Sequence, residues 1–407
     1  MASIVRFKKA SWISMRFIIF LTVFLSLYSG LHLYGFLSVK RALAPGPKVN
    51  VALILFMALM IFAPIIIRFL ERNDLVSPAR FFAYIGYIWM GLLFLFFSFA
   101  VALDVYRLIL EATQKAFNAD FSRFSLSKAQ CFFIPLFLSV GITTFGFFEA
   151  LNIRTERVII RTDTITRKIG RLKIVQISDV HLGLIVGEHR LRRIIKQIRA
   201  EKPDILVSTG DLVDGQMNNL SGLVGMIRDI PTKYGKYAVT GNHEFHAGLQ
   251  DALKVTRNAG FRVLRGEALN IPGVINIAGV DDSAGKRYGL KPNVSEKVLL
   301  SKLPRKYFTL LLKHRPQLNE TEGGLFDLQL SGHTHKGQIF PFSLIVKLFY
   351  PNFSGLVSLD NNSYLYVSRG TGTWGPPVRF LCPPEVTVIE LVHESKANHQ
   401  TRPLKNS

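Results

Sequence analysis

The sequence has few cysteines and few acidic residues, and both shortages narrow the classes of protein it can belong to. Two cysteines in 407 residues exclude a scaffold held together by disulfides, which needs several paired cysteines. Asp and Glu number 28 against 50 Lys and Arg, so the formal net charge is +22 and an anionic partner or surface is indicated. Charged residues make up only 19% of a chain that is 49% hydrophobic, which excludes extensive disorder.

Long hydrophobic runs are concentrated in the first 150 residues. Four of them reach the length of about 20 apolar residues that a helix needs to cross a bilayer. They lie at 17–39, 49–70, 81–103 and 131–151. The alternative is the helical core of a soluble domain, but such helices normally keep a polar face, and these runs have none. We therefore expect a membrane domain with four transmembrane helices over residues 1–153.

Basic residues beside these runs predict which side of the membrane each end occupies. An even number of spans leaves both ends of the membrane domain on one side, and the cytoplasmic side is the one richer in Lys and Arg. With the N-terminus inside, the inner segments hold Arg6, Lys8, Lys9, Arg16, Arg68, Arg72, Arg80, Arg154, Arg157, Arg161, Arg167, Lys168, Arg171 and Lys173. The outer loops hold only Lys40, Arg41, Lys48, Arg107, Lys115, Arg123 and Lys128. This bias favours a cytoplasmic C-terminal domain.

The residues after the membrane domain alternate between strand-like and helix-like patterns. Short apolar runs predict strands at 172–178, 204–208, 237–240, 275–280, 308–312, 328–330, 364–367 and 386–391. Helical periodicity is present at 190–201 and 249–259. Together they predict an α/β domain of layered sheets with helices outside over residues 154–393, followed by a polar tail at 394–407.

Polar residues with metal-binding side chains stand where five of these strands end. In chain order they are Asp179-Val-His181, Gly210-Asp211-Leu-Val-Asp214, Gly241-Asn242-His243-Glu244, His314 and Gly332-His333-Thr-His335. Strand ends of this kind are where α/β sheets bind ligands. Oxygen and imidazole donors without a thiolate suit Mn, Fe, Zn or a similar divalent ion. The number of donors predicts two metal ions bridged by Asp211, an arrangement that can clamp a phosphoryl group.

The order of these motifs resembles that of the calcineurin-like metallophosphoesterases over about residues 171–392. The bacterial membrane-associated branch is the most similar, because of His314-Arg-Pro316, the segment from Gly332 to Gln338, and Val367-Ser-Arg-Gly370 before Pro383-Pro-Glu385. The resemblance implies a four-layer fold, with two β-sheets packed as a sandwich and flanked by helices, after the four transmembrane helices. It also implies a multi-pass protein of a bacterial cytoplasmic (inner) membrane.

The resemblance further implies a role for each motif residue. One metal would be held by Asp179, His181, Asp211 and His335, and the other by Asp211, Asn242, His314 and His333. A water or hydroxide bridging the two metals would attack phosphorus in line. His243 would contact the phosphate and protonate the leaving oxygen, while Asp214 and Glu244 would orient histidines. Lys336 departs from the branch, which often has glycine at that position.

A second feature links the predicted site to lipid. Residues 339–356, directly after the metal-binding histidines, are very apolar for a loop beside a polar site. They are either a buried connection in the second sheet, or an apolar wall or lipid-dipping loop that receives an acyl chain.

The leading hypothesis is a membrane-bound, metal-dependent phosphoesterase that hydrolyses a phosphodiester or pyrophosphate bond of a lipid or lipid-linked precursor. UDP-2,3-diacylglucosamine is a specific possibility that the resemblance implies. A tethered phosphodiesterase for soluble nucleotides and a non-enzymatic membrane protein with a decayed domain are the alternatives. Membrane lipids are the expected partners. Nucleic acid is not expected, because no recognition motif accompanies the basic charge.

Overall fold

A computed structural model describes residues 2–215, 217, 220–290, 294–318, 324–360 and 362–395. The expected polar tail at 394–407 lies outside the described residues from position 396 onward. The chain divides into two compact units. One comprises Met1–Phe147 with Gly375–Val378, and the other Phe148–Trp374 with Arg379–Ser407.

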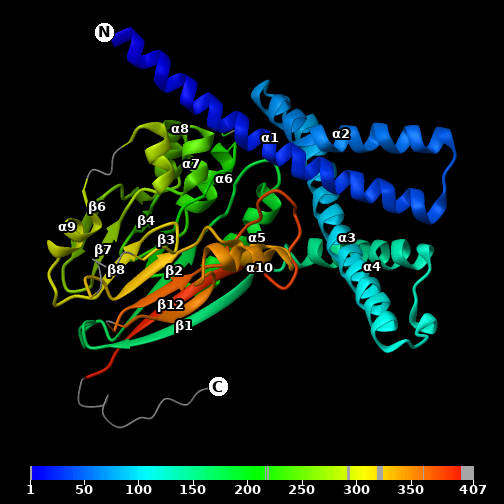
Figure 1. Cartoon of the computed structure of the whole chain (residues 1–407). Coiled ribbons are helices and arrows are strands. Elements are labelled where there is room, and N and C mark those ends of the chain that lie inside the picture. The colour runs from blue at the N-terminus through cyan, green and yellow to red at the C-terminus, as the bar shows by residue number, and fades with distance from the viewer. Residues whose placement is uncertain are drawn as a thin grey trace. The chain divides into compact units, whose positions relative to one another are not determined.

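The first unit consists of long apolar helices (Figure 1). They are α1 (Ala2–Leu43), α2 (Pro47–Arg72), α3 (Val76–Phe117) and α4 (Lys128–Glu149), with a 3-10 turn, η1, at Ser122–Phe124. Each of the four α-helices is long and apolar enough to contribute a membrane span. Their positions agree with the four hydrophobic runs found in the sequence.

Helix α3 is longer than the sequence analysis expected. Its 42 residues correspond to about 63 Å at 1.5 Å per residue, roughly twice the thickness of the hydrocarbon core. Arg107 and Lys115, which we expected in an outer loop, lie on this helix. The helical pattern continues past the apolar run because residues 104–117 contain no glycine or proline to end it.

Polar contacts join α1 to α3 inside the first unit. The indole Nε1 of Trp89 donates a hydrogen bond to Nε2 of His32 over 2.9 Å. The hydroxyl of Tyr34 donates to Oδ2 of Asp104 over 2.6 Å. Polar groups in a membrane span are stable when they pair with one another, so these contacts account for polar residues in otherwise apolar helices.

The second unit contains two six-stranded sheets (Figure 1). The first has the order β1-β12-β2-β3-β4-β5, with strands at Arg154–Thr162, Glu385–His393, Arg171–Ile177, Ile205–Ser208, Lys236–Ala238 and Arg262–Val263. The second has the order β10-β11-β9-β8-β7-β6, with strands at Gly355–Ser358, Tyr364–Val367, Leu328–Ser331, Thr309–Leu312, Ile275–Gly279 and Glu267–Ile271. Strands β2 to β5 are parallel to one another, as are β7, β8, β9 and β11.

A shared hydrophobic core joins the two sheets. Ile174 and Val207 of the first sheet belong to the same buried cluster as Ile277, Leu310 and Leu328 of the second. The helices of this unit are α5 (Glu188–Glu201), α6 (Ser221–Arg228), α7 (Asn242–Ala247), α8 (Leu249–Asn258), α9 (Glu296–Ser301) and α10 (Phe342–Phe349). Short 3-10 turns include η2 (Ser283–Tyr288) and η4 (His335–Gly337). The predicted α/β sandwich, flanked by helices and preceded by four long apolar helices, is confirmed.

Each strand expected from the sequence is present to within a residue or two, but several others were missed. The most informative is β1, whose basic residues we interpreted only as a charge cluster. It pairs in parallel with β12 along its whole length. Arg157 lies 2.7 Å from Glu201 and 3.5 Å from Glu390, and Arg171 also pairs with Glu390. The positive charges of Arg157 and Arg171 are therefore partly neutralised by glutamates that lie far away in the sequence.

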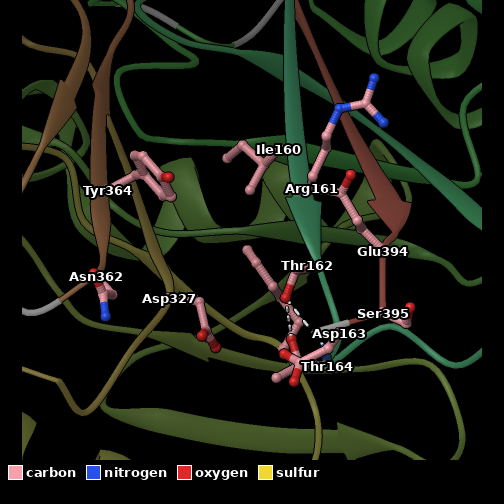
Figure 2. A pocket seen from close by; sticks show the side chains of 11 residues that line it. Ile160, Arg161, Thr162, Asp163, Thr164, Asp327, Asn362, Tyr364, Glu394 and Ser395 are labelled. Atoms are coloured by element: carbon pink, nitrogen blue, oxygen red, sulfur yellow. Dashed lines mark hydrogen bonds between the residues drawn. The ribbon is translucent and has the colours of Figure 1, made fainter. Parts of the chain in front are cut away.

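A cavity of about 300 Å³ lies at one end of the sandwich. Figure 2 shows Thr162, Asp327 and Tyr364 among its lining residues. Asp327 directly precedes β9, and Phe308, another lining residue, directly precedes β8. This cavity therefore lies at the amino ends of those strands, opposite the edge where the metal-binding motifs emerge.

Candidate metal centre

The predicted metal-binding residues come together at one edge of the sandwich. From the first sheet, β2 is followed by Asp179 and His181, β3 by Asp211, and β4 by Asn242. From the second sheet, β8 is followed by His314, and β9 by His333 and His335. Because carboxyl ends of parallel strands meet at the same edge, residues far apart in sequence become neighbours here.

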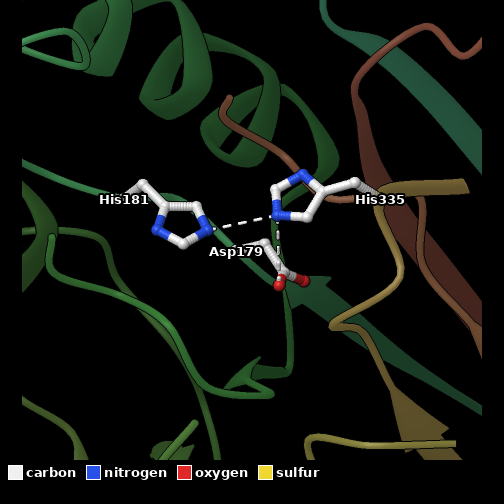
Figure 3. A group of neighbouring side chains, drawn as sticks. All are labelled: Asp179, His181 and His335. Carbon is white, nitrogen blue, oxygen red and sulfur yellow. Dashed lines mark hydrogen bonds and ion pairs between the residues drawn. The ribbon is translucent and has the colours of Figure 1, made fainter. Parts of the chain in front are cut away.

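One group of donors consists of Asp179, His181 and His335 (Figure 3). Nε2 of His181 lies 3.1 Å from Nε2 of His335, which in turn lies 3.5 Å from Oδ1 of Asp179. Figure 3 shows the two imidazole rings directed toward each other beside the carboxylate. All three side chains are buried.

A second group forms around the carboxylate of Asp211. Nε2 of His314 lies 3.2 Å from Oδ2 of Asp211 and 3.2 Å from Oδ1 of Asn242. Nδ1 of His333 lies 3.2 Å from the same His314 nitrogen. Asp211 also lies 4.0 Å from Nε2 of His181, a residue of the first group. Its carboxylate is thus placed between the two groups.

The chemistry of these side chains fits a pair of divalent ions. Carboxylate and amide oxygens with imidazole nitrogens are ligands for Mn, Fe and Zn. The donor atoms of Asp179, His181 and His335 all lie within 4.8 Å of one another, and so do those of Asp211, His314 and His333. A carboxylate placed between two such groups could be shared by two metal ions, as a two-metal site for phosphoryl chemistry can use.

Several of the predicted metal ligands have the same unfavourable backbone conformation. Asp179, His181, Asp211, His333 and His335 have φ values of 53°, 53°, 51°, 70° and 47°. This left-handed region is unfavourable for residues other than glycine. Such strain persists only where surrounding structure imposes it, and it clusters at functional sites. Five of the seven predicted ligands share it.

Gly332 allows the exits of β2 and β9 to approach closely. A Cβ at this position would lie 1.9 Å from Oγ of Ser178 and 2.2 Å from Oδ2 of Asp179. The backbone N–H of His333 donates to both carboxylate oxygens of Asp179 over 3.1 Å. The two sheets are therefore joined through the carboxylate that heads the first group of donors.

Asp211 and His314 form a buried pair of opposite charges. Burial by itself would raise the pKa of Asp211, but His314 and His243 hold it well below its usual range. Burial opposes the charged form of His314 as well, yet Asp211 raises its pKa to about 10. Nδ1 of His314 lies 2.8 Å from the carbonyl oxygen of Thr209, which orients the ring so that Nε2 faces the carboxylate.

The other histidines of the site are held in the neutral form. Burial lowers the pKa of His181 to about 4 and also lowers that of His333. For His335, burial and the neighbouring guanidinium of Arg379 hold the pKa well below its ordinary value. Neutral imidazole is the form that binds a metal, so three nitrogen donors need no deprotonation at neutral pH.

His243 lies beside the donor groups at the start of α7. Its backbone N–H donates to Oδ1 of Asp211 over 2.8 Å, and its Nδ1 lies 2.9 Å from Oδ1 of Asp214. Burial lowers the pKa of His243, but the charges of Asp211 and Asp214 outweigh this and raise it to about 9. These carboxylates favour the protonated imidazole, the form that a general acid needs.

Glu244 is placed differently from the expectation that it orients a histidine. Its carboxylate accepts hydrogen bonds from the backbone N–H groups of Gly241, Asp211 and Leu212 over 2.6, 3.0 and 2.8 Å. It is buried and holds the exits of β3 and β4 in register. Its effect on the site passes through the backbone of Asp211.

Arg379 is a residue of the site that sequence reasoning missed. It is fully buried, and its guanidinium donates to the carbonyl oxygens of Arg369, His335 and Gly372 over 2.7, 3.2 and 2.5 Å. Nη2 also lies 3.2 Å from Nδ1 of His335. The signal in the sequence is a single arginine within the apolar and proline-rich segment 374–386, where a charge needs a specific partner.

The backbone at position 336 has a conformation that suits glycine better than lysine. Lys336 has φ 51°, a conformation that glycine adopts without strain, so a glycine in related sequences would suit the same turn. The thiol of Cys382 donates to the carbonyl oxygen of Lys336 over 3.1 Å. This contact helps to hold Lys336 in its positive-φ conformation.

Comparison with known proteins identifies what this arrangement is similar to. Residues 172–337 match the sequence model of the calcineurin-like phosphoesterases. An uncharacterized metallophosphoesterase of Aquifex aeolicus is 40% identical over 257 residues, which cover 63% of this chain and 98% of that protein. A transmembrane protein with metallophosphoesterase domain from Danio rerio is 28% identical over 63% of this chain and 62% of its own length. Among solved structures, a dimetal phosphatase from Danio rerio shares 13% identity, with a TM-score of 0.34 over 49% of this chain and 87% of that one.

Proposed function

The chain belongs to the calcineurin-like metallophosphoesterases, and from this premise we propose that it hydrolyses a phosphodiester or pyrophosphate bond in a lipid or lipid-linked precursor. Membership of this family makes the protein a phosphoester hydrolase. Its four long apolar helices indicate a membrane protein. The observation that carries the proposal is the convergence of seven donor side chains, five of them buried, on a chain with four candidate membrane spans.

We assign the seven side chains to two divalent ions, with Mn, Fe and Zn as the candidates. The first ion would be held by Asp179, His181, Asp211 and His335, and the second by Asp211, Asn242, His314 and His333. Ions bound there lower the pKa of a bound water and offset negative charge on phosphoryl oxygens. The placement of Asp211 between both groups supports its assignment as the shared ligand.

His243 supplies the proton in this proposal. It lies beside Asp211, its pKa is raised by Asp211 and Asp214, and its side chain is 15% exposed. An imidazolium in this position can contact a phosphoryl oxygen and donate a proton to the leaving oxygen. Asp214 positions the ring through Nδ1, which leaves Nε2 to make that donation.

Two features support a lipid or lipid-linked substrate. The chain places its hydrolase domain directly after four membrane spans, and an exposed apolar helix follows the last metal-binding histidine. UDP-2,3-diacylglucosamine combines a pyrophosphate with two acyl chains and is the specific substrate we propose to test. We place the protein in a bacterial inner membrane with its catalytic domain on the cytoplasmic side, which the distribution of basic residues supports.

The substitution Asp211→Ala tests the proposed chemistry. Purified full-length protein with Mn²⁺ should hydrolyse bis(p-nitrophenyl) phosphate, and the variant should lose at least about 10³-fold in kcat, because it lacks the ligand shared by both ions. Asp229→Ala is the matched control, since the Asp229 side chain is 62% exposed and should leave turnover unchanged. Full activity of the Asp211 variant would refute the two-metal assignment.

Substrate profiles test the lipid assignment separately. Wild-type protein should hydrolyse UDP-2,3-diacylglucosamine, or a phosphoester in a membrane lipid extract, with a higher kcat/KM than soluble nucleotide diesters. A preference for soluble nucleotides would replace this assignment with that of a tethered nucleotide phosphodiesterase, while leaving the metal chemistry intact.

A further inference from the structure

Helix α10 exposes an unusual amount of apolar side chain. Leu344, Ile345, Leu348 and Phe349 are 59%, 46%, 81% and 75% exposed, and no residue of the helix is buried. Their spacing, i, i+1, i+4 and i+5, places them on one side of the helix, which we call the α10 face. Isolated exposed apolar residues are ordinary, but a contiguous group marks an interaction surface. For residues 342–349, the buried connection considered from the sequence is therefore wrong, whereas Ile339 is buried and Gly355 begins a strand of the second sheet.

The neighbouring loops carry further exposed apolar residues. Trp374 and Leu381 are 54% and 60% exposed. The backbone N–H of Trp374 donates to Oε1 of Gln338, and Nε2 of Gln338 donates to the carbonyl oxygen of Trp374, over 3.0 and 2.9 Å. The N–H of Phe340 donates to the carbonyl oxygen of Phe380 over 3.1 Å, and Phe380 directly precedes Leu381. Hydrogen bonds therefore attach these residues to the segment that leads into α10.

The helix is fixed to the metal centre at both ends. At its start, a Cβ on Gly337 would lie 2.4 Å from Cα of Ser343, so the first turn packs directly on the turn containing His335. At its end, the ring of Tyr350 lies 5.4 Å from that of His333, and Arg315 donates to the Tyr350 hydroxyl over 3.1 Å. Whatever covers the α10 face is thereby held at a fixed distance from the metal ligands.

The charge around this helix favours one kind of occupant. Residues 336–358 contain Lys336 and Lys347 and no Asp or Glu. An apolar face flanked by basic residues is typical of a helix that lies in a membrane interface, where anionic headgroups attract lysine. The same chain is a membrane protein, so a bilayer is present wherever the protein works.

We propose that the α10 face inserts into the interfacial layer of the lipid bilayer and holds the metal centre at the level of the lipid headgroups. This inference deepens the proposed function and rests on it for the nature of the substrate. A phosphate attached to a lipid lies at that level, so the site can take it while the acyl chains remain in the membrane. A soluble phosphoester needs no such insertion.

Fluorescence quenching in proteoliposomes tests the insertion without measuring activity. In a Cys131→Ser background, Leu348→Cys carries an environment-sensitive thiol label in the full-length protein. Cys382 stays in place because it is 1% exposed. Val298→Cys is the matched control, an exposed apolar residue of α9 in the same unit. The vesicles contain phosphatidylethanolamine and phosphatidylglycerol, with or without brominated acyl chains, and iodide serves as the aqueous quencher.

We expect brominated lipid to quench the label at position 348 at least about threefold more than the label at 298, and iodide to show the reverse order. Equal iodide access at both positions would overturn the proposal. Protection of position 348 from both quenchers would also overturn it, because protein would then cover the face. Phe349→Cys repeats the measurement if the Leu348 variant fails to fold.

A kinetic comparison separates this inference from the proposed function. The double variant Leu348→Ser/Phe349→Ser should retain turnover of bis(p-nitrophenyl) phosphate while losing about tenfold in kcat/KM on a vesicle-bound phosphoester, since apolar contact with the membrane is reduced. Equal activity of wild type and variant on the vesicle substrate would contradict the insertion and leave the hydrolase assignment standing. Loss of both activities would show that α10 supports the site itself, which would also contradict the proposal.

Discussion

At the scale of single residues, His243 illustrates how position and charge give a side chain its role. The ring is partly buried beside Asp211 and Asp214, two carboxylates that raise its pKa to about 9. The same ring in water would be mostly neutral at pH 7. The contacts with Asp211 and Asp214 that raise its pKa also fix the ring beside the donor groups, so its acidity and its orientation have a common origin.

The role of His243 predicts a dependence on the leaving group. His243→Ala should slow hydrolysis of an alkyl phosphodiester by about 10²- to 10⁴-fold, because an alkoxide needs a proton to leave. Hydrolysis of the p-nitrophenyl diester should fall much less, since nitrophenolate leaves without one. Measured kcat values for the two substrates check this. An equal loss on both would show that His243 acts in binding rather than as an acid.

The sequence identified a candidate site residue where that residue belongs to a short motif. Asp179, Asp211 and His335 were recognisable because each stands in a short polar motif after an apolar run. Arg379 has no such motif, and its contact with His335 joins residues 44 positions apart. The backbone role of Glu244 was also missed, because a sequence shows the carboxylate but not the three N–H groups that point at it.

At the scale of elements, the site depends on strand ends from two sheets meeting at close range. The exit of β9 approaches that of β2 so closely that Gly332 has no space for a Cβ. The side chains of Ser178 and Asp179 occupy that space, and the Asp179 carboxylate accepts from the backbone N–H of His333. The position of the Asp179 carboxylate therefore depends directly on how closely the two sheets pack at this point.

The close approach predicts the effect of adding one methyl group. Gly332→Ala should displace Asp179 and lower metal content and kcat together, by at least about tenfold in kcat, because a shift of an ångström disturbs a preorganised site. Gly222→Ala in α6 is the matched control, since nothing lies within 4 Å of its added Cβ. Elemental analysis and steady-state kinetics measure the two effects. A Gly332 variant with wild-type metal content and kcat would contradict the structural argument.

Elements differ in how well the sequence predicts them. Buried central strands such as β2 and β3 read as apolar runs because both of their faces are covered. Strand β1 lies at the sheet edge and mixes charged, polar and apolar residues, most of them at least partly exposed. Its charges therefore obscured its pairing with β12. The C-terminal end of α3 was also predicted too early. Hydropathy shows where the apolar run ends, and the helix continues beyond it to Phe117.

At the scale of the whole molecule, the net charge of +22 has two separate explanations. Some of the basic residues after the fourth helix form ion pairs within the second unit, as Arg157 and Arg171 do with Glu390. Others remain available to set the orientation of the membrane spans. The distribution of the basic residues supports the proposed cytoplasmic side of the catalytic domain.

Reporter fusions test that orientation directly. A green fluorescent protein fused after Ser407 should fluoresce, and alkaline phosphatase fused there should be inactive, because the C-terminal end is expected in the cytoplasm. The same reporters inserted after Ala44, between α1 and α2, should give the opposite pair of signals. Active alkaline phosphatase at the C-terminal position would show that the orientation is inverted.

The most direct test of the account is a titration of metal into the chelator-treated, full-length protein, followed by the rate of bis(p-nitrophenyl) phosphate hydrolysis. The assignment of seven donors to two ions predicts no turnover in the metal-free protein and saturation at about two equivalents of Mn²⁺ per chain. Turnover that survives complete removal of metal, or that saturates at one equivalent, would contradict it.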